Sequence, residues 1–153
     1  MKLLIAYGTL TFNTELVAQK VYDVLKEDTN WELVDLKSMY DIQDVSELEQ
    51  YDCFIFSTSS WDNNENDYPP DTEDFVAILK ENPPNIEGKK AAFFGLGESH
   101  YEHFCGGIAN LAKLMIDQYK VIQIGEIKTI DGYPEDPILD DMSEWAKAIT
   151  KQI

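Results

Sequence analysis

Short apolar runs alternate with amphipathic stretches along the whole chain. Two continuous apolar runs, Leu3–Ala6 and Cys53–Phe56, predict buried strands. Lys89–Gly95 predicts a further strand. Trp31–Leu36 alternates between apolar and polar residues and predicts a second strand, at an edge of the sheet. Val121–Ile124 and Ile127–Ile130 predict a fifth strand that is broken at Gly125.

Apolar positions three and four residues apart predict helices between these strands. We expect them to run from Thr14 to about Lys26, through Phe75–Leu79, from Ile108 to Tyr119 and over Leu139–Ile153, with a short helix around Ser46–Glu49. Pro69-Pro70 should forbid helix at that point. Asp71 or Thr72 is therefore the expected cap of the second helix.

Strands that alternate with helices predict an α/β fold with a parallel sheet covered on both faces. We expect a single domain, residues 1–153, with a doubly wound five-stranded sheet in the order 2-1-3-4-5. In that order, the ligand crevice lies at the carboxyl ends of strands 1, 3 and 4. Gly8–Thr14, Ser57–Tyr68 and Gly95–Cys105 should then form one site.

Composition narrows the range of partners. The net charge is −17 over 153 residues, and all twelve basic residues are lysines. Nucleic acid and anionic membranes are poor partners for such a chain, and basic proteins are good ones. Two cysteines form neither a disulfide framework nor a metal site. The first apolar run is too short for a signal peptide or a membrane span, so we expect a cytoplasmic monomer.

The first of the three loops has the character of a phosphate site. It follows a buried strand and opens a helix, whose free N–H groups and dipole favour an anion. Thr9, Thr11 and Thr14 add hydroxyl donors, and Asn13 adds an amide. The alternative is an ordinary strand-to-helix connection with an Asn or Thr cap.

The other two loops each carry a large aromatic residue. Trp61 follows the third strand and Tyr101 the fourth. Facing each other, they would form a slot for a flat ring. Taken singly, Trp61 could be a partly buried surface aromatic and Tyr101 could pack at a helix start. A planar ring beside a phosphate site describes a flavin mononucleotide.

Three motifs carry a resemblance to a known family. They are Thr9-x-Thr11-x-Asn13-Thr14-Glu15, Ser57-Thr58 followed by Trp61, and Gly95-Leu96-Gly97-Glu98-Ser99-His100-Tyr101-Glu102-His103-Phe104-Cys105. With them the chain resembles a flavodoxin over essentially its whole length. Ile130–Pro134 runs directly into the last helix, which is similar to the short-chain branch.

The resemblance implies an FMN site and assigns residues to it. The phosphate would be bound by Thr9, Leu10, Thr11, Phe12, Asn13 and Thr14 together with Ser57. The second loop would add Thr58, Ser59, Ser60, Trp61 and Asp62, with Trp61 on one face of the ring and Tyr101 on the other. The pyrimidine edge would meet backbone groups of Gly97, Glu98, His103, Phe104 and Cys105. No catalytic side chain and no metal are implied, because the flavin does the chemistry.

The chain departs from the family pattern in three places. Phe12 stands where the family usually has Gly; a left-handed backbone would be costly for Phe, so we expect an αR backbone or a reshaped loop. An exposed Phe12 could contact a partner, or it could pack the loop. Ser59-Ser60 are extra residues before Trp61, which leaves Tyr68 as an alternative stacking residue. Asp62 replaces a frequent Gly, so the peptide flip that stabilises the semiquinone should be harder.

The function implied is that of a soluble, low-potential one-electron carrier whose FMN shuttles between semiquinone and hydroquinone. It would replace ferredoxin, with ferredoxin–NADP reductase or another ferredoxin-dependent enzyme as its basic partner. The acids Asp62, Glu65, Asp67 and Glu98 would disfavour the anionic hydroquinone and orient that partner.

Two other functions are alternatives on the same topology. A flavodoxin-like NAD(P)H:quinone reductase would need a basic group for the nicotinamide phosphates, and a chain without Arg argues against it. A phosphoacceptor receiver domain needs acids after strand 1 and an Asp ending strand 3. Tyr7-Gly8-Thr9 and Ser57 stand there instead, which excludes it.

Overall fold

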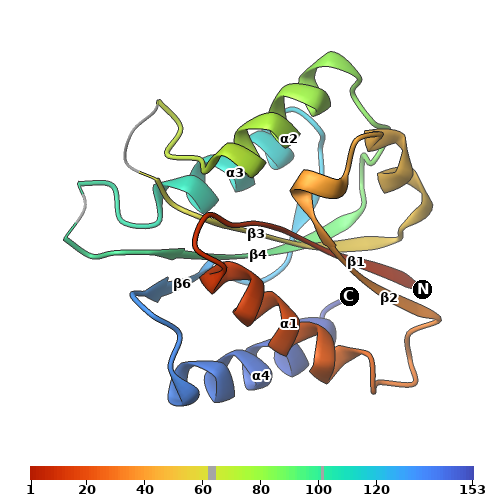
Figure 1. Cartoon of the computed structure of the whole chain (residues 1–153). Coiled ribbons are helices and arrows are strands. Elements are labelled where there is room, and N and C mark those ends of the chain that lie inside the picture. Colours follow the sequence, from red (N-terminus) through yellow and green to blue (C-terminus); the bar gives the residue numbers. More distant parts are fainter. Residues whose placement is uncertain (62–64, 101) are drawn as a thin grey trace.

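The architecture is a parallel sheet between two layers of helices, seen in a computed structural model that describes residues 1–61, 65–100 and 102–153 (Figure 1). The strands are β1 (Lys2–Gly8), β2 (Leu33–Ser38), β3 (Cys53–Ser59), β4 (Lys90–Gly97), β5 (Ile122–Gln123) and β6 (Lys128–Asp131). Their order is β2-β1-β3-β4-β5, and β6 also pairs with β4. The predicted fold class and strand order are confirmed.

The fifth position of the sheet is occupied by two short strands in succession. β5 pairs with the start of β4, where Lys90 lies opposite Ile122, and β6 pairs with its end, where Phe94 lies opposite Lys128. Gly125 lies between them with a φ of 65°, a conformation that favours glycine. The break predicted at Gly125 is therefore present.

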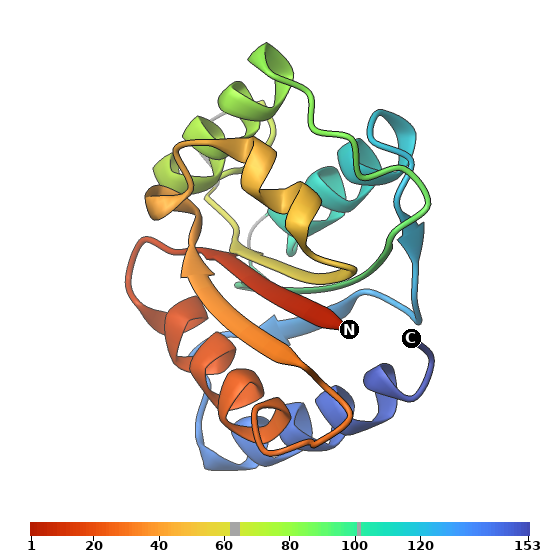
Figure 2. The same ribbon diagram turned by 90° about the vertical axis from the view of Figure 1, so that its right-hand side faces the viewer.

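The helices α1 (Asn13–Leu25) and α4 (Asp136–Thr150) cover one face of the sheet. The helices α2 (Pro70–Glu81) and α3 (Gly106–Asp117) cover the other face, together with the 3₁₀ segments Met39–Asp41 and Val45–Gln50 (Figure 2). Among the described residues, no helix is long and apolar enough to cross a membrane. The edge position of β2 is confirmed, although the strand begins at Leu33 rather than at Trp31.

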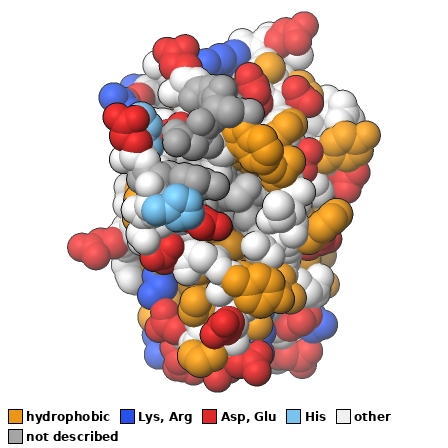
Figure 3. Space-filling model, turned by 60° about the vertical axis from the view of Figure 1, so that its left-hand side comes forward, with side chains coloured by type: hydrophobic (Ala, Val, Ile, Leu, Met, Phe, Trp, Pro, Cys, Tyr) orange, Lys and Arg blue, Asp and Glu red, His pale blue; other side chains and the backbone are white. Residues whose placement is uncertain are grey.

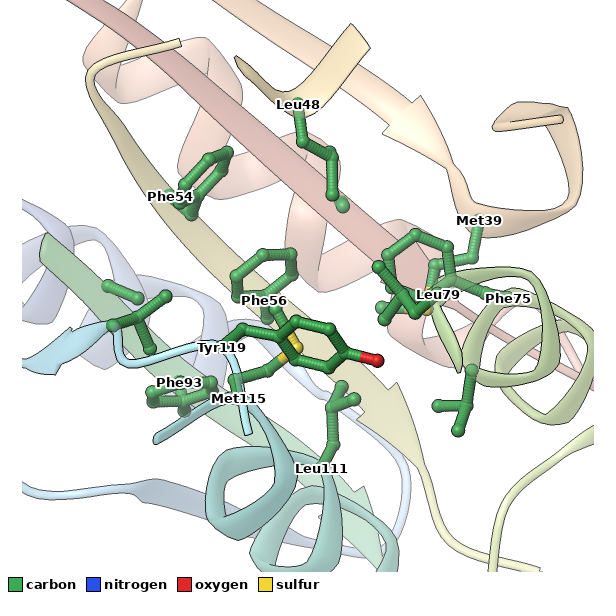
Figure 4. Packing of buried hydrophobic residues seen from close by; sticks show 14 of the residues in the cluster. Met39, Leu48, Phe54, Phe56, Phe75, Leu79, Phe93, Leu111, Met115 and Tyr119 are labelled. Carbon is green, nitrogen blue, oxygen red and sulfur yellow. The ribbon is translucent and has the colours of Figure 1, made fainter. Parts of the chain in front are cut away.

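Aromatic side chains fill the core between the sheet and α2 and α3 (Figure 4). The Phe54 and Phe56 rings stack at 5.1 Å between centroids, and Phe56 and Phe93 at 5.9 Å. On β1, the continuous apolar run is fully buried, as the pattern predicts for a strand covered on both faces.

The start of α2 differs from the prediction. The helix begins at Pro70, and Pro69 is its N-cap, without a side-chain capping bond. A proline needs no N–H at the first helical position, so the proline pair starts this helix instead of preventing it. Neither Asp71 nor Thr72 is the cap. The Asp71 carboxylate accepts the N–H of Thr9, and the Thr72 hydroxyl bonds that of Thr58 at 2.6 Å.

Buried acidic protons make the fold sensitive to alkali. Burial raises the pKa of Tyr7 to about 12, that of Cys53 to about 12 and that of Cys105 to about 11. The unfolded chain releases these protons near pH 10 for tyrosine and 9 for cysteine. The stability that these three groups contribute is therefore complete at neutral pH, and it is lost as the pH rises from about 9 toward 12.

We expect the free energy of unfolding in urea to fall between pH 8 and pH 11 by at least about 1.4 kcal/mol, the equivalent of one pKa unit. The Cys53→Ala variant should lose part of this dependence, since it lacks one of the buried groups. Equal free energies at both pH values would contradict the prediction.

Candidate cofactor site

A cleft of about 150 Å³ opens where β1, β3 and β4 end. It is lined by Leu10, Thr11, Asn13, Ser59, Ser60, Trp61, Leu96, Gly97, Glu98 and Gly132. The three predicted loops do therefore meet. Sequence reasoning did not include Gly132, which follows β6 and donates its N–H to the Gly97 carbonyl at 2.8 Å. Its place after the fifth strand, beside the end of the fourth, could have revealed it.

Four hydroxyl oxygens at this edge are buried without a hydrogen-bond partner in the described part of the chain. They belong to Thr9, Thr14, Ser57 and Ser59. A buried polar group without a partner costs roughly 1–3 kcal/mol. Two of these hydroxyls come from the first loop and α1, and two from the end of β3. Their common place, at the carboxyl ends of β1 and β3 and the start of α1, indicates donors arranged for the atoms of a ligand.

The amino end of α1 adds backbone donors beside these hydroxyls. The first intrahelical bond runs from the Leu16 N–H to the Phe12 carbonyl at 3.0 Å, so the N–H groups of Asn13, Thr14 and Glu15 precede the helical ladder. The N-cap residue, Phe12, makes no side-chain capping bond. An ordinary connection with an Asn or Thr cap is thus not what the structure has, and the helix start suits an anion.

Phe12 takes a left-handed backbone conformation, with a φ of 67°. The expectation of an αR backbone was therefore wrong. This conformation costs a non-glycine residue roughly 1–2 kcal/mol. The side chain is 71% exposed, so Phe12 does not pack the loop.

The extra serines of the second loop lengthen β3 and join it to its neighbours. The Ser60 N–H donates to the Leu96 carbonyl, and the Ser60 hydroxyl accepts the Gly107 N–H at 2.9 Å. Trp61 then donates its N–H to the Asp67 carbonyl at 2.7 Å and lines the cleft. Tyr68, the alternative aromatic, is only 4% exposed and lies in the core.

The second loop is also bonded to α3 and to the third loop. The Asn110 side-chain amide donates to the Asn66 carbonyl at 3.0 Å. His103 Nδ1 lies 3.3 Å from the carboxylate of Asp67, which is almost completely buried. These contacts hold two walls of the cleft together.

Several predicted site residues lie around the cleft without facing it. Thr58 is fully buried, and its hydroxyl bonds Thr72 and the Ser59 carbonyl, so it is engaged inside the protein. Cys105 is buried beneath the third loop, with its thiol 3.7 Å from the Gly95 carbonyl. Phe104 is exposed beside it. Asp62 and Tyr101 lie outside the described residues.

Negative charge dominates the surroundings of the cleft (Figure 3). Of the twelve lysines, none lies in residues 9–14, 57–68, 95–105 or 131–136. At the end of β6, the Asp131 carboxylate accepts the Ser99 N–H at 2.9 Å, and this bonding to Ser99 lowers the pKa of Asp131. Within the described ranges, no group of three or more His, Cys, Asp or Glu side chains could hold a metal ion.

A larger hollow of about 590 Å³ lies elsewhere, between the end of α1 and the end of α4. It is lined by Trp31, Lys147 and Ile153 among others. None of the four residues with unpartnered hydroxyls lines this hollow, whereas Ser59 lines the cleft. The crevice at the carboxyl ends of the strands therefore remains the candidate site, because the ligand donors gather there.

Comparison with known proteins agrees with this arrangement. The family model described as flavodoxin matches residues 5–145. A flavodoxin of Maridesulfovibrio salexigens is 32% identical over 155 residues and covers 99% of both chains. Oxidised flavodoxin 2 from Bacillus cereus superposes with a TM-score of 0.85 at 29% identity, over 100% of both chains. A Fusobacterium nucleatum flavodoxin bound to flavin mononucleotide gives a TM-score of 0.76 at 19% identity, over 99% of this chain and 98% of that one. By the family match and the identity to its relatives, the chain belongs to the flavodoxin family.

Proposed function

We propose that FMN binds in the crevice with its phosphate among the four buried hydroxyls of Thr9, Thr14, Ser57 and Ser59, and with its ring against Trp61. As a flavodoxin, the chain is an electron-transfer protein that uses FMN and has no substrate turnover of its own. Bound FMN supplies the redox chemistry. The hydroxyl cluster is the single observation that carries the assignment, because neutral donors at a helix start suit a phosphate.

The residues of this chain divide the binding between two ends of the crevice. At the phosphate end, hydroxyls and α1 N–H groups act without any lysine in the loop, so hydrogen bonds and the helix dipole hold the charge. At the other end, Trp61 lines the cleft and offers an aromatic side chain for stacking on a flat ring. Gly97 and Glu98 also line the cleft, where their backbone would orient that ring.

The acids around the cleft disfavour added negative charge on the cofactor. A unit charge roughly 8 Å away, at an effective dielectric near 20, contributes about 2 kcal/mol. Glu98 and Asp131 are both exposed at the crevice, and no lysine in the loops offsets them. This field favours release of an electron and supports a low-potential carrier.

The partner is a basic redox protein, and ferredoxin–NADP reductase in the cytoplasm fits this description. Flavodoxins act as carriers between partner proteins. A net charge of −17 attracts a basic surface, and the crevice edge carries acids without lysines. The comparisons match flavodoxins and do not support the alternative of an NAD(P)H:quinone reductase.

Two measurements test this function. Apoprotein titrated with FMN should give a yellow one-to-one complex, detected by quenching of flavin fluorescence. With NADPH and a bacterial ferredoxin–NADP reductase, the complex should be reduced faster at about 0.05 M than at about 0.5 M salt, because salt screens the attraction. Absence of FMN binding would overturn the cofactor site. NADPH oxidation by the complex alone would favour the quinone reductase.

A further inference from the structure

Phe12 has a strained backbone and an exposed side chain, so it does not stabilise the fold. It combines a left-handed φ of 67° with a side chain that is 71% exposed. Glycine would take the same conformation without strain. Since the ring mostly contacts solvent, packing within the chain does not offset the strain. A strained residue that the surrounding structure maintains is a pointer to function.

Other exposed apolar side chains lie around the same crevice. Phe12 lies between Thr11 and Asn13, which both line the cleft, and Tyr133 directly follows the lining residue Gly132. We call the exposed side chains on these loops the rim patch. Its members are Leu10, Phe12, Phe104 and Tyr133. The face that includes this end of the sheet carries apolar side chains interspersed with acids (Figure 3). Exposed apolar patches with a polar rim mark interaction sites.

The charge around the rim patch describes the surface that fits it. The loops that carry the patch contain no lysine. Among the described residues, exposed acids on these loops include Glu98, Glu102, Asp131 and Glu135, and Glu65 is exposed on the second loop. A complementary surface therefore has an apolar hollow at its centre and lysines or arginines around it. The acids around the rim patch repel another copy of this chain, whose net charge is also −17.

We infer that the rim patch is the docking surface for the electron-transfer partner and that Phe12 is its anchor, inserted into an apolar hollow that basic residues surround. The inference rests on the proposed carrier function. Aromatic anchors dominate the energetics of interfaces, whereas exposed charges mainly steer the encounter. The strained backbone at Phe12 therefore holds the phenyl ring beside the cofactor site and keeps that ring exposed to the partner.

The test compares Phe12→Gly, Phe12→Tyr and a matched control, Ile122→Ala. Ile122 is also exposed, at 52%, but it pairs with Lys90 at the opposite end of β4. We expect Phe12→Gly to raise the KM of a bacterial ferredoxin–NADP reductase for the FMN complex roughly tenfold, or about 1.4 kcal/mol. Phe12→Tyr should retain the wild-type KM, and so should Ile122→Ala. The FMN affinity of each variant is measured beside the KM. It should be unchanged in Ile122→Ala, and in Phe12→Gly it should change far less than the KM does. Phe12→Gly should also shift the urea midpoint upward, because its backbone strain is removed.

The outcomes separate the two proposals. A wild-type KM in Phe12→Gly, with wild-type protein reduced normally, overturns the docking inference alone. A loss of FMN affinity in Phe12→Gly as large as the change in KM also overturns it, since the ring would then belong to the cofactor site. Wild-type protein that binds FMN but accepts no electrons from the reductase overturns both the partner and the anchor.

Discussion

The double variant Thr14→Val, Ser57→Ala should bind FMN at least about 100-fold more weakly than the wild type. Both hydroxyls are buried without a partner at the end of β3 and the start of α1. Hydrogen bonds to a charged group contribute about 1.5–3 kcal/mol each, and about 1.4 kcal/mol is tenfold in affinity. Fluorescence titration of the apoprotein measures the effect directly. The apoprotein should not lose stability, since each substitution removes an unpartnered polar atom.

Riboflavin is the matched control ligand, because it has the same ring without the phosphate. Its affinity should change by no more than about threefold. Thr58→Val is the matched control variant, since its hydroxyl bonds Thr72 and not the cleft. That variant should lose stability while keeping the ratio of FMN to riboflavin affinity. If the double variant lowers the affinities for FMN and riboflavin equally, the phosphate binds elsewhere.

The variant Gly107→Ala should lower the free energy of unfolding by about 1–3 kcal/mol, as overpacking does. A Cβ on Gly107 would lie 2.8 Å from the Ser59 carbonyl oxygen and 2.9 Å from that of Asp67. Both atoms are backbone, so α3 must move away from the second loop. FMN affinity should fall roughly tenfold as well, because the second loop carries Trp61 into the cleft. Urea unfolding and FMN titration give the two values.

Gly88→Ala is the control for a general effect of removing a glycine. Gly88 has a φ of 81°, and apart from its two chain neighbours no described residue lies within 4 Å of the position of an added Cβ. It should cost about 1 kcal/mol through its backbone and leave FMN affinity unchanged. Gly107→Ala with wild-type FMN affinity would show that the second loop does not depend on its contact with α3.

The order of the sheet and the location of the crevice could be predicted because they depend on patterns within short segments. A strand buried on both faces needs a continuous apolar run, and β1 and β3 have one. Parallel strands bring their carboxyl ends to one edge, so the loops that follow them must meet there. The break at Gly125 was readable for the same reason, since glycine interrupts an apolar pattern locally.

The start of α2 and the backbone of Phe12 could not be predicted, because contacts far apart in the sequence decide them. Asp71 accepts from Thr9, and Thr72 bonds Thr58, so neither side chain is left to cap its own helix. Phe12 lies between the end of β1 and the start of α1, and both elements are held in place by core packing. The backbone at Phe12 must therefore adopt the conformation that connects these two fixed elements. A local preference worth roughly 1–2 kcal/mol does not override that constraint.

The bonds between the second loop and α3 bear on how fast the cofactor can exchange. Ser60 with Gly107, Asn66 with Asn110 and Asp67 with His103 join these segments through the protein's own groups. This wall therefore loses its conformational entropy when the chain folds, and not when FMN arrives. The preformed wall should make cofactor association fast and leave the residence time to be set at the phosphate end.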